Sequence, residues 1–326
     1  MEIKNAVILP VITPNTITFG SLDPYGSSII FPTGSLIDHL PEFETQANTY
    51  FDTYGCVSHS FENGVEAVIK ASVNNQWLKD NAYVNGDPNF SDRDLIVLSG
   101  TKPGVGNGGQ KVLDTAREKG LVAQILASWD SANRDPRVNI QTVYYAYLRN
   151  KESEEFAKDF NNKLEITGTW VHRNNWEEAS KEGALQVYVK AWYENADGIY
   201  YNPGKTYNHA VLMADYKAKK IYDTYKPELK ELVSWDDAHE WALKINIKEK
   251  YMPKPVIANN TLIQLVEGNG GFGLYLDDKI FVDDLSKILA SWLVRNNGKL
   301  DGKTRALTLS DWNSFNKVNL KGEAVA

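Results

Sequence analysis

The stretch Tyr54-Gly55-Cys56-Val57-Ser58-His59-Ser60-Phe61 decides the fold, because it places the single cysteine of the chain at the first turn of a predicted helix. That helix covers residues 56–70. Its apolar residues recur at three- and four-residue steps, as one face of a helix requires: Phe61, Gly64, Val65, Val68 and Ile69. Glu62, Asn63 and Glu66 fall off this apolar face. The pattern therefore predicts an amphipathic helix that begins at a thiol.

Composition bounds the class of protein around this helix. The chain has 326 residues, of which 42% are hydrophobic and 24% charged, as expected for one main globular domain with appendages. A net charge of −7 argues against nucleic acid as a partner. No segment approaches the roughly 20 apolar residues that span a bilayer.

The compartment follows from the N-terminus and from cysteine usage. The apolar run Ala6–Ile12 is broken by Pro10 and is too short for a signal peptide. A single cysteine forms no intrachain disulfide, which fits a reducing compartment or a particle assembled in one. We therefore expect a cytoplasmic or virion-associated protein.

The periodicity along the chain changes from helical in the first part to alternating in the second. Residues 1–40 read as short strands and loops, and 81–109 as a polar loop containing a short apolar segment at 95–98. Helices are predicted at 110–119, which stops at Gly120, and at 151–164 and 175–194. Strands are predicted at 209–216, 221–225 and 241–247.

The segment Met252-Pro253-Lys254-Pro255 reads as a linker. Beyond it, strands at 261–266 and 274–282 and a helix at 285–294 predict a separate C-terminal α/β appendage. We therefore divide the chain into an N-terminal extension (1–40), a main domain (41–250) and an appendage (251–326).

Cys56 carries the chemistry if its thiol is activated. A helix N-terminus and a nearby imidazolium both stabilise a thiolate and lower the pKa of a thiol. A lone cysteine is more often a small buried hydrophobe, so helix position alone leaves both interpretations open.

The residues around Cys56 resemble the nucleophile segment of papain-like cysteine peptidases. Further segments resemble others of that family in the same order over residues 41–247: Asn89–Leu95, Gly106–Gly109, Tyr207–Val211, Ile221–Tyr225 and Trp241–Leu243. The lead-in Phe51-Asp52-Thr53 and the strand Asn208-His209-Ala210-Val211 also resemble papain-like proteins found in phage-derived sequences.

The resemblance implies an α+β, papain-like fold, with an N-terminal helical half that carries the nucleophile helix and a C-terminal antiparallel β half. It implies Cys56 as nucleophile, His209 as general base, Asp223 in place of the orienting Asn, and Gln46 as a side-chain donor to the oxyanion.

Several residues depart from the pattern of the family. Val57 replaces the usual aromatic residue, and Gln46 lies ten residues before Cys56, farther than the usual spacing. The structural disulfides and a recognisable inhibitory propeptide are missing. These departures leave open a catalytically inactive relative.

The predicted hairpin places Asp223 near His209 independently of the resemblance. The start of the first strand lies beside the far end of the second, so His209 and Asp223 can meet, although the alternative is a solvated turn acid. His59, one turn after Cys56, is an alternative base, but it matches a core aromatic of the family. The remaining histidines, His39, His172 and His239, lack a partner pattern.

We expect no metal and no cofactor, because the chain has no cysteine pair and no histidine-rich ligand spacing. Three functions compete. The first is a cysteine endopeptidase with a peptide or protein substrate. The second is an inactive papain-like structural component, with virion structural proteins as partners. The third is a Cys-His-Asp acyltransferase of the transglutaminase type. Oligomeric state and cleavage specificity cannot be read from the sequence.

Overall fold

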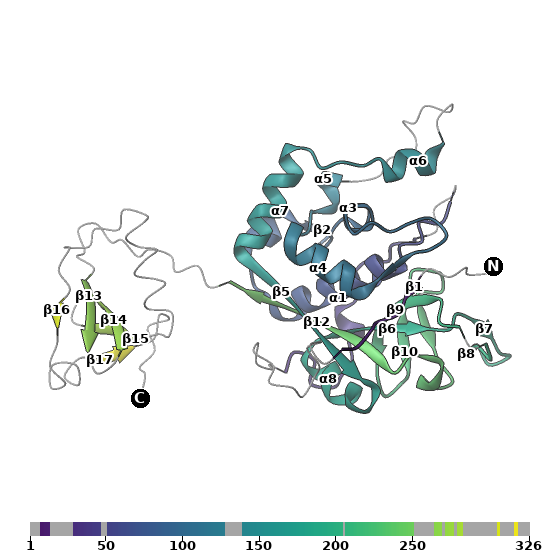
Figure 1. Cartoon of the computed structure of the whole chain (residues 1–326). Coiled ribbons are helices and arrows are strands. Elements are labelled where there is room, and N and C mark those ends of the chain that lie inside the picture. The colour runs from purple at the N-terminus through teal and green to yellow at the C-terminus, as the bar shows by residue number, and fades with distance from the viewer. Residues whose placement is uncertain are drawn as a thin grey trace. The chain divides into compact units, whose positions relative to one another are not determined.

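The computed structural model describes residues 7–13, 29–46, 51–127, 139–204 and 206–250, together with five strands after residue 263. The chain divides into two compact units, Met1–Lys250 and Tyr251–Ala326 (Figure 1). Within the described ranges, every helix is too short or too polar to cross a membrane. The further division of the first unit at residue 40 stays a prediction.

A six-stranded antiparallel sheet forms the centre of the first unit. From one edge to the other its strands are β11 (Leu229–Glu231), β10 (Lys220–Tyr222), β9 (His209–Asp215), β6 (Ala184–Val189), β12 (Trp241–Glu249) and β5 (Leu164–His172). Strands β9 and β10 form a hairpin in which Tyr222 lies opposite Leu212. This hairpin brings the start of β9 close to the residues that follow β10.

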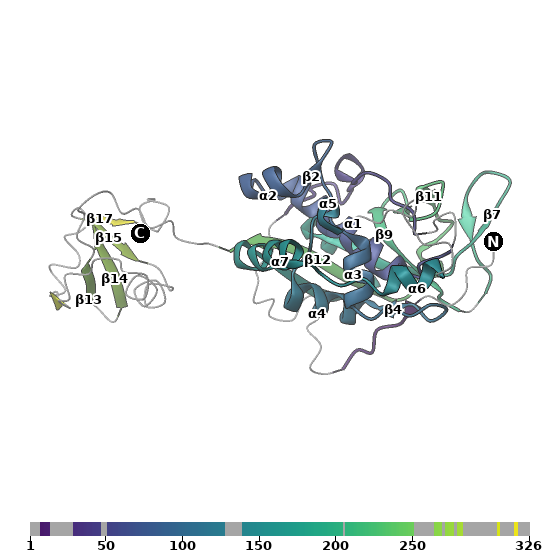
Figure 2. The ribbon, with the colours of Figure 1, turned by 90° about the horizontal axis from the view of Figure 1, so that it is seen from above.

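Helix α1 (Cys56–Ser72) packs across β9, β6 and β12. Figure 2 shows α1 from above together with β9 and β12. Alternate residues of β6 point to the two faces of the sheet: Gln186 and Tyr188 lie on the side of α1, whereas Val187 and Val189 join a second core beneath helix α8 (Trp176–Glu182). Both faces of the sheet are therefore covered.

Shorter elements complete the first unit. The remaining helices are α2 (Gln76–Asn81), α3 (Asp92–Leu98), α4 (Gly109–Lys119), α5 (Gln124–Ala127), α6 (Ile140–Tyr145) and α7 (Lys151–Lys163), with 3-10 turns η1 (Ile37–His39), η2 (Arg173–Asn175) and η3 (Trp235–Asp237). Strand β1 (Val7–Ile8) pairs with β4 (Asn107–Gly108), β2 (Tyr83–Val84) with β3 (Asp87–Pro88), and β7 (Tyr193–Glu194) with β8 (Tyr200–Tyr201).

The expected α+β architecture is confirmed, with a helical half that contains the Cys56 helix and an antiparallel β half. The predicted helices at 56–70, 110–119 and 151–164 are α1, α4 and α7. Gly120 ends α4 at φ +70°, where a Cβ would lie 2.3 Å from the carbonyl oxygen of Ala157. The predicted strands at 209–216 and 241–247 are β9 and β12.

Two predicted elements are wrong. The helix predicted at 175–194 ends at Glu182, and β6 follows it. All six residues of β6 are buried, because both faces of this strand are covered, so burial does not alternate along it. The loop predicted at 81–109 contains helix α3, whose N-cap Ser91 accepts a hydrogen bond from the amide of Asp94.

The strand predicted at 221–225 is shorter than expected, so that Asp223 follows the last residue of β10. The expected polar face of α1 is also wrong: Glu62, Asn63 and Glu66 are buried. The amide of Phe90 donates to Glu66 at 2.7 Å, which shows how neighbouring loops cover this side of the helix. Helix α1 is therefore enclosed all round over residues 56–69.

The second unit contains a five-stranded sheet in the order β16 (Arg305–Ala306), β13 (Gln264–Gly268), β14 (Gly271–Leu276), β15 (Lys279–Val282) and β17 (Asn316–Val318). Predicted strands at 261–266 and 274–282 overlap β13, β14 and β15. The helix predicted at 285–294 lies outside the described residues.

Gly55, which precedes α1, is expected to tolerate no side chain. A Cβ there would lie 2.3 Å from the Cδ1 methyl of Ile96, which is fully buried. Gly55→Ala should lower the free energy of unfolding by about 1–3 kcal/mol, measured by urea denaturation. Adding Ile96→Val, which removes that methyl, should recover part of the loss. A Gly55→Ala protein with an unchanged unfolding midpoint would contradict the packing described here.

Candidate active site

Cys56 is the first residue of α1, and Gly55 caps the helix without a side-chain hydrogen bond. The thiol therefore lies at the positive end of the helix dipole. The first turn is fixed from both sides. Ser60 Oγ donates to the carbonyl of Cys56 at 2.6 Å, and Gln186 Nε2 on β6 donates to the carbonyl of Val57 at 2.7 Å. These bonds hold the position of Cys56 against the sheet.

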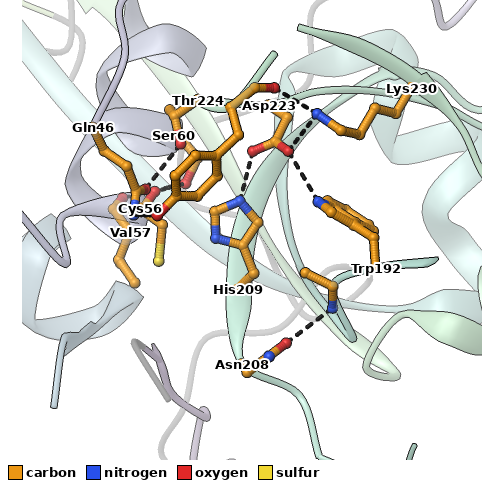
Figure 3. Close-up of polar contacts among 12 residues, drawn as sticks. Gln46, Cys56, Val57, Ser60, Trp192, Asn208, His209, Asp223, Thr224 and Lys230 are labelled. Carbon is orange, nitrogen blue, oxygen red and sulfur yellow. Dashed lines mark hydrogen bonds and ion pairs between the residues drawn. The ribbon is translucent and has the colours of Figure 1, made fainter. Parts of the chain in front are cut away.

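His209 and Asp223 form a buried pair beside this thiol. His209 Nε2 lies 2.6 Å from Asp223 Oδ1, and both side chains are fully buried. Figure 3 shows the other ring nitrogen, Nδ1, on the side of the imidazole that faces the Cys56 sulfur. The structure thus brings together Cys56 from α1, His209 from β9 and Asp223 from the segment after β10.

The electrostatics of the pair favour its charged form. Burial opposes a charge on His209, but Asp223 and Cys56 outweigh it and raise the pKa of His209 from 6.5 to about 10. Burial also opposes the charge on Asp223, yet His209 and Lys230 hold the pKa of that carboxyl below its ordinary value. An imidazolium beside a carboxylate is therefore the favoured state near neutral pH.

Two partners of Asp223 are not apparent from the sequence. Lys230 Nζ lies 2.7 Å from Asp223 Oδ2, and Trp192 Nε1 donates to the same oxygen at 3.2 Å. The Trp192 ring also stands edge-on to His209 at 5.8 Å between centroids. Lys230 is 3% exposed although it belongs to a short polar strand, so only the fold reveals its role.

Gln46, the expected oxyanion donor, is 1% exposed and is held by other groups. Its Nε2 donates to Asp52 Oδ1 at 3.1 Å and to Tyr225 Oη at 2.6 Å, while its Oε1 accepts from Thr224 Oγ1 at 2.9 Å. Both amide hydrogens are thus engaged by other side chains. The oxyanion role of Gln46 stays a prediction.

The other histidines have separate partners. The Nδ1 atom of His59, the alternative base, lies 2.7 Å from Asp92 Oδ2. His172 pairs with Glu240 at the surface, at 3.8 Å. Glu44, His59 and Asp92 form a group that could hold a metal ion, which the sequence could not indicate because the three residues come from separate segments.

The described N-terminal residues lie at the edge of this region. Strand β1 pairs in parallel with Asn107–Gly108, the strand that abuts α1. Val7 and Leu9 pack against the same apolar cluster that contains Cys56. The thiol itself is fully buried, so a substrate needs these or other covering groups to move.

A charge in this N-terminal segment should therefore open the site. Val7→Asp or Leu9→Asp should increase the rate of Cys56 alkylation by iodoacetamide, because a carboxylate does not pack against the apolar cluster. Val11→Asp is the matched control, since Val11 is 82% exposed. Equal rates in all three variants and the unmodified chain would show that β1 does not limit access.

The Lys230 contact can be tested through stability. Asp223→Asn should lower the free energy of unfolding by about 3–5 kcal/mol, because it leaves Lys230 buried without a counter-charge. Adding Lys230→Met should restore much of this loss, as thermal and urea unfolding would report. Equal stability of the single and the double variant would argue against a buried ion pair.

Comparisons with known proteins add a likeness in fold at low identity. No protein-family profile matches the chain, and no curated protein matches it by sequence. Among solved structures, it is similar to a recombinant stem bromelain precursor (15% identity, TM-score 0.45, 71% of this chain and 74% of that one). It is also similar to xylellain, a cysteine protease from Xylella fastidiosa (11% identity, TM-score 0.46, 74% of this chain and 96% of that one). A third similar structure is digestive procathepsin L 3 of Tenebrio molitor (10% identity, TM-score 0.43, 71% of this chain and 73% of that one). These likenesses to papain-like cysteine proteases concern the fold alone, and none of the three is described as a phage or virion protein.

Proposed function

We propose that the chain is a cysteine peptidase that cleaves peptide bonds through Cys56, His209 and Asp223. The observation that carries this proposal is the fully buried His209–Asp223 pair, 2.6 Å apart, placed beside a thiol at a helix N-terminus. A nucleophile, a base and an orienting group in this order form the arrangement that activates a thiol for acyl transfer. Peptide or protein substrates follow from that chemistry.

The proposed reaction has two halves. The Cys56 thiolate attacks the peptide carbonyl carbon, and the C–N bond breaks as His209 gives its Nδ1 proton to the leaving amine. A water molecule then loses a proton to His209 and attacks the acyl carbon, and the C–S bond breaks, which releases the acid and returns the thiolate beside the imidazolium. The backbone N–H of Cys56 is a donor for the oxyanion in both halves.

Asp223 and its partners are proposed to position the base. Asp223 accepts from His209 Nε2 and so leaves Nδ1 to face the thiol. Lys230 and Trp192 hold the second carboxylate oxygen, which fixes the plane of the carboxylate. Gln46 would join the oxyanion site only by giving up its contact with Asp52 or Tyr225.

The second candidate is a catalytically inactive papain-like scaffold, and the complete burial of Cys56 favours it. An acyltransferase would use the same three residues with an amine in place of water. Nothing in the described site selects an amine over water, so product analysis with an added primary amine separates these two enzymes.

The pH dependence of Cys56 reactivity tests the proposal. Because the pKa of His209 lies near 10, the imidazolium is present at all lower pH values and is lost as pH rises through 10. Alkylation by iodoacetamide should therefore stay fast below pH 7 and fall at least about 10-fold in His209→Ala. Cleavage of a fluorogenic peptide library should decline above pH 10 and fall by about 100-fold or more in the same variant.

Cys56→Ala should abolish cleavage, and His172→Ala is the matched control because that histidine lies at the surface. Slow alkylation with a midpoint near the roughly 8.5 of a free thiol, unchanged in His209→Ala, would instead favour the inactive scaffold. The N-terminal variants Val7→Asp and Leu9→Asp serve as the opened form in both assays.

A further inference from the structure

A second group of ionisable side chains lies beside the first two turns of α1. Glu44 from the segment before α1, His59 on α1 and Asp92 at the start of α3 each offer one ligand atom, and these atoms all lie within 4.8 Å of one another. His59 Nδ1 and Asp92 Oδ2 are 2.7 Å apart. His59 and Asp92 are buried, and Glu44 is partly exposed, so the group reaches solvent at one side.

Glu62 adds a fourth buried group, whose carboxyl lies beside that of Asp92. It follows His59 by three residues on α1 and so shares its helix face. Glu62 is 1% exposed and His59 is 4% exposed, and among the described residues His59 Nε2 has no hydrogen-bond partner. Carboxylates buried side by side are unfavourable unless a cation or a proton lies between them.

The described side chains around the cluster also leave its carboxyls without a positive charge. Burial, followed by the nearby Asp92 carboxyl, raises the pKa of Glu44 to about 10 and that of Glu62 well above its ordinary value. Nearby cationic side chains are engaged elsewhere: Arg149 lies 2.6 Å from Asp94, and Lys70 lies 2.7 Å from Asp87.

We propose that Glu44, His59, Asp92 and Glu62 form a binding site for a divalent first-row transition metal. One imidazole nitrogen and three carboxylate oxygens are the donors of zinc and manganese sites, whereas calcium takes six to eight oxygen ligands. Binding would neutralise the carboxyls that lie together here and give the buried oxygens a partner. The ion would link α1, which carries Cys56, to α3 and to the segment that carries Glu44.

The site is independent of the proposed peptidase activity, and the test reads metal content and not turnover. The full chain carrying Cys56→Ser is used, because this change removes the thiol, which would itself bind Zn²⁺. The protein is loaded with Zn²⁺, dialysed against metal-free buffer and analysed for zinc per chain. Melting temperature is compared with and without EDTA, and titration calorimetry in two buffers measures the protons released.

We expect one tightly held zinc ion per chain, a melting temperature lowered by EDTA, and net proton release on binding. In the same background, Glu62→Gln and Glu44→Gln should each weaken zinc binding at least about 10-fold, as removing one ligand does. Glu44 lies at the partly exposed rim, so Glu44→Gln remains informative if Glu62→Gln folds poorly.

Glu240→Gln is the matched control, because it removes a carboxylate that pairs with a histidine at the surface. Its zinc content should equal that of the Cys56→Ser parent. A parent that retains no zinc and melts at the same temperature with and without EDTA would overturn the proposal, and the cluster would then be a proton-holding one. Zinc retained equally by Glu44→Gln and Glu62→Gln would overturn it as well.

Discussion

The enclosure of helix α1 is the constraint on which the rest of the structure depends. Its residues 56–69 are buried on every side, by the sheet and by α3, α4 and the surrounding loops. A helix in this position has no solvent to satisfy its polar side chains, so each requires a partner within the protein. The thiol of Cys56, the imidazole of His59 and the carboxyls of Glu62 and Glu66 all fall under this rule.

Two buried groups of ionisable side chains lie next to this helix, and they differ in the balance of their charges. Around His209, one carboxylate is balanced by two cationic groups, since Asp223 lies 2.6 Å from His209 and 2.7 Å from Lys230. Beside His59, the Asp92 carboxyl lies close to the carboxyls of Glu44 and Glu62. The first arrangement places an imidazole beside the thiol, whereas the second is the proposed metal site.

Much of the fold follows from local pattern. The period of the apolar residues predicts α1, α4 and α7, and alternation predicts β9 and β12. The prediction fails at β6, because residues 175–194 are rich in Glu, Lys and Ala, which favour a helix, whereas β6 is a strand buried within the sheet. Glu62 and Glu66 read as solvent-facing because the loops that cover them come from distant parts of the chain. Helix α3 is short, so its apolar residues 95–98 do not reveal a period.

The sequence by itself determined that a single cysteine begins a helix and that one hairpin carries both His209 and Asp223, because the local period and the short connection between residues 216 and 221 fix both. Only the tertiary structure decided that Lys230 and Trp192 share the Asp223 carboxylate, that Gln46 is engaged by Asp52 and Tyr225, and that Glu44 and Asp92 meet His59. These contacts join segments far apart in the chain. Spacing along the sequence carries no record of them, since the packing of helices and strands alone sets which side chains meet.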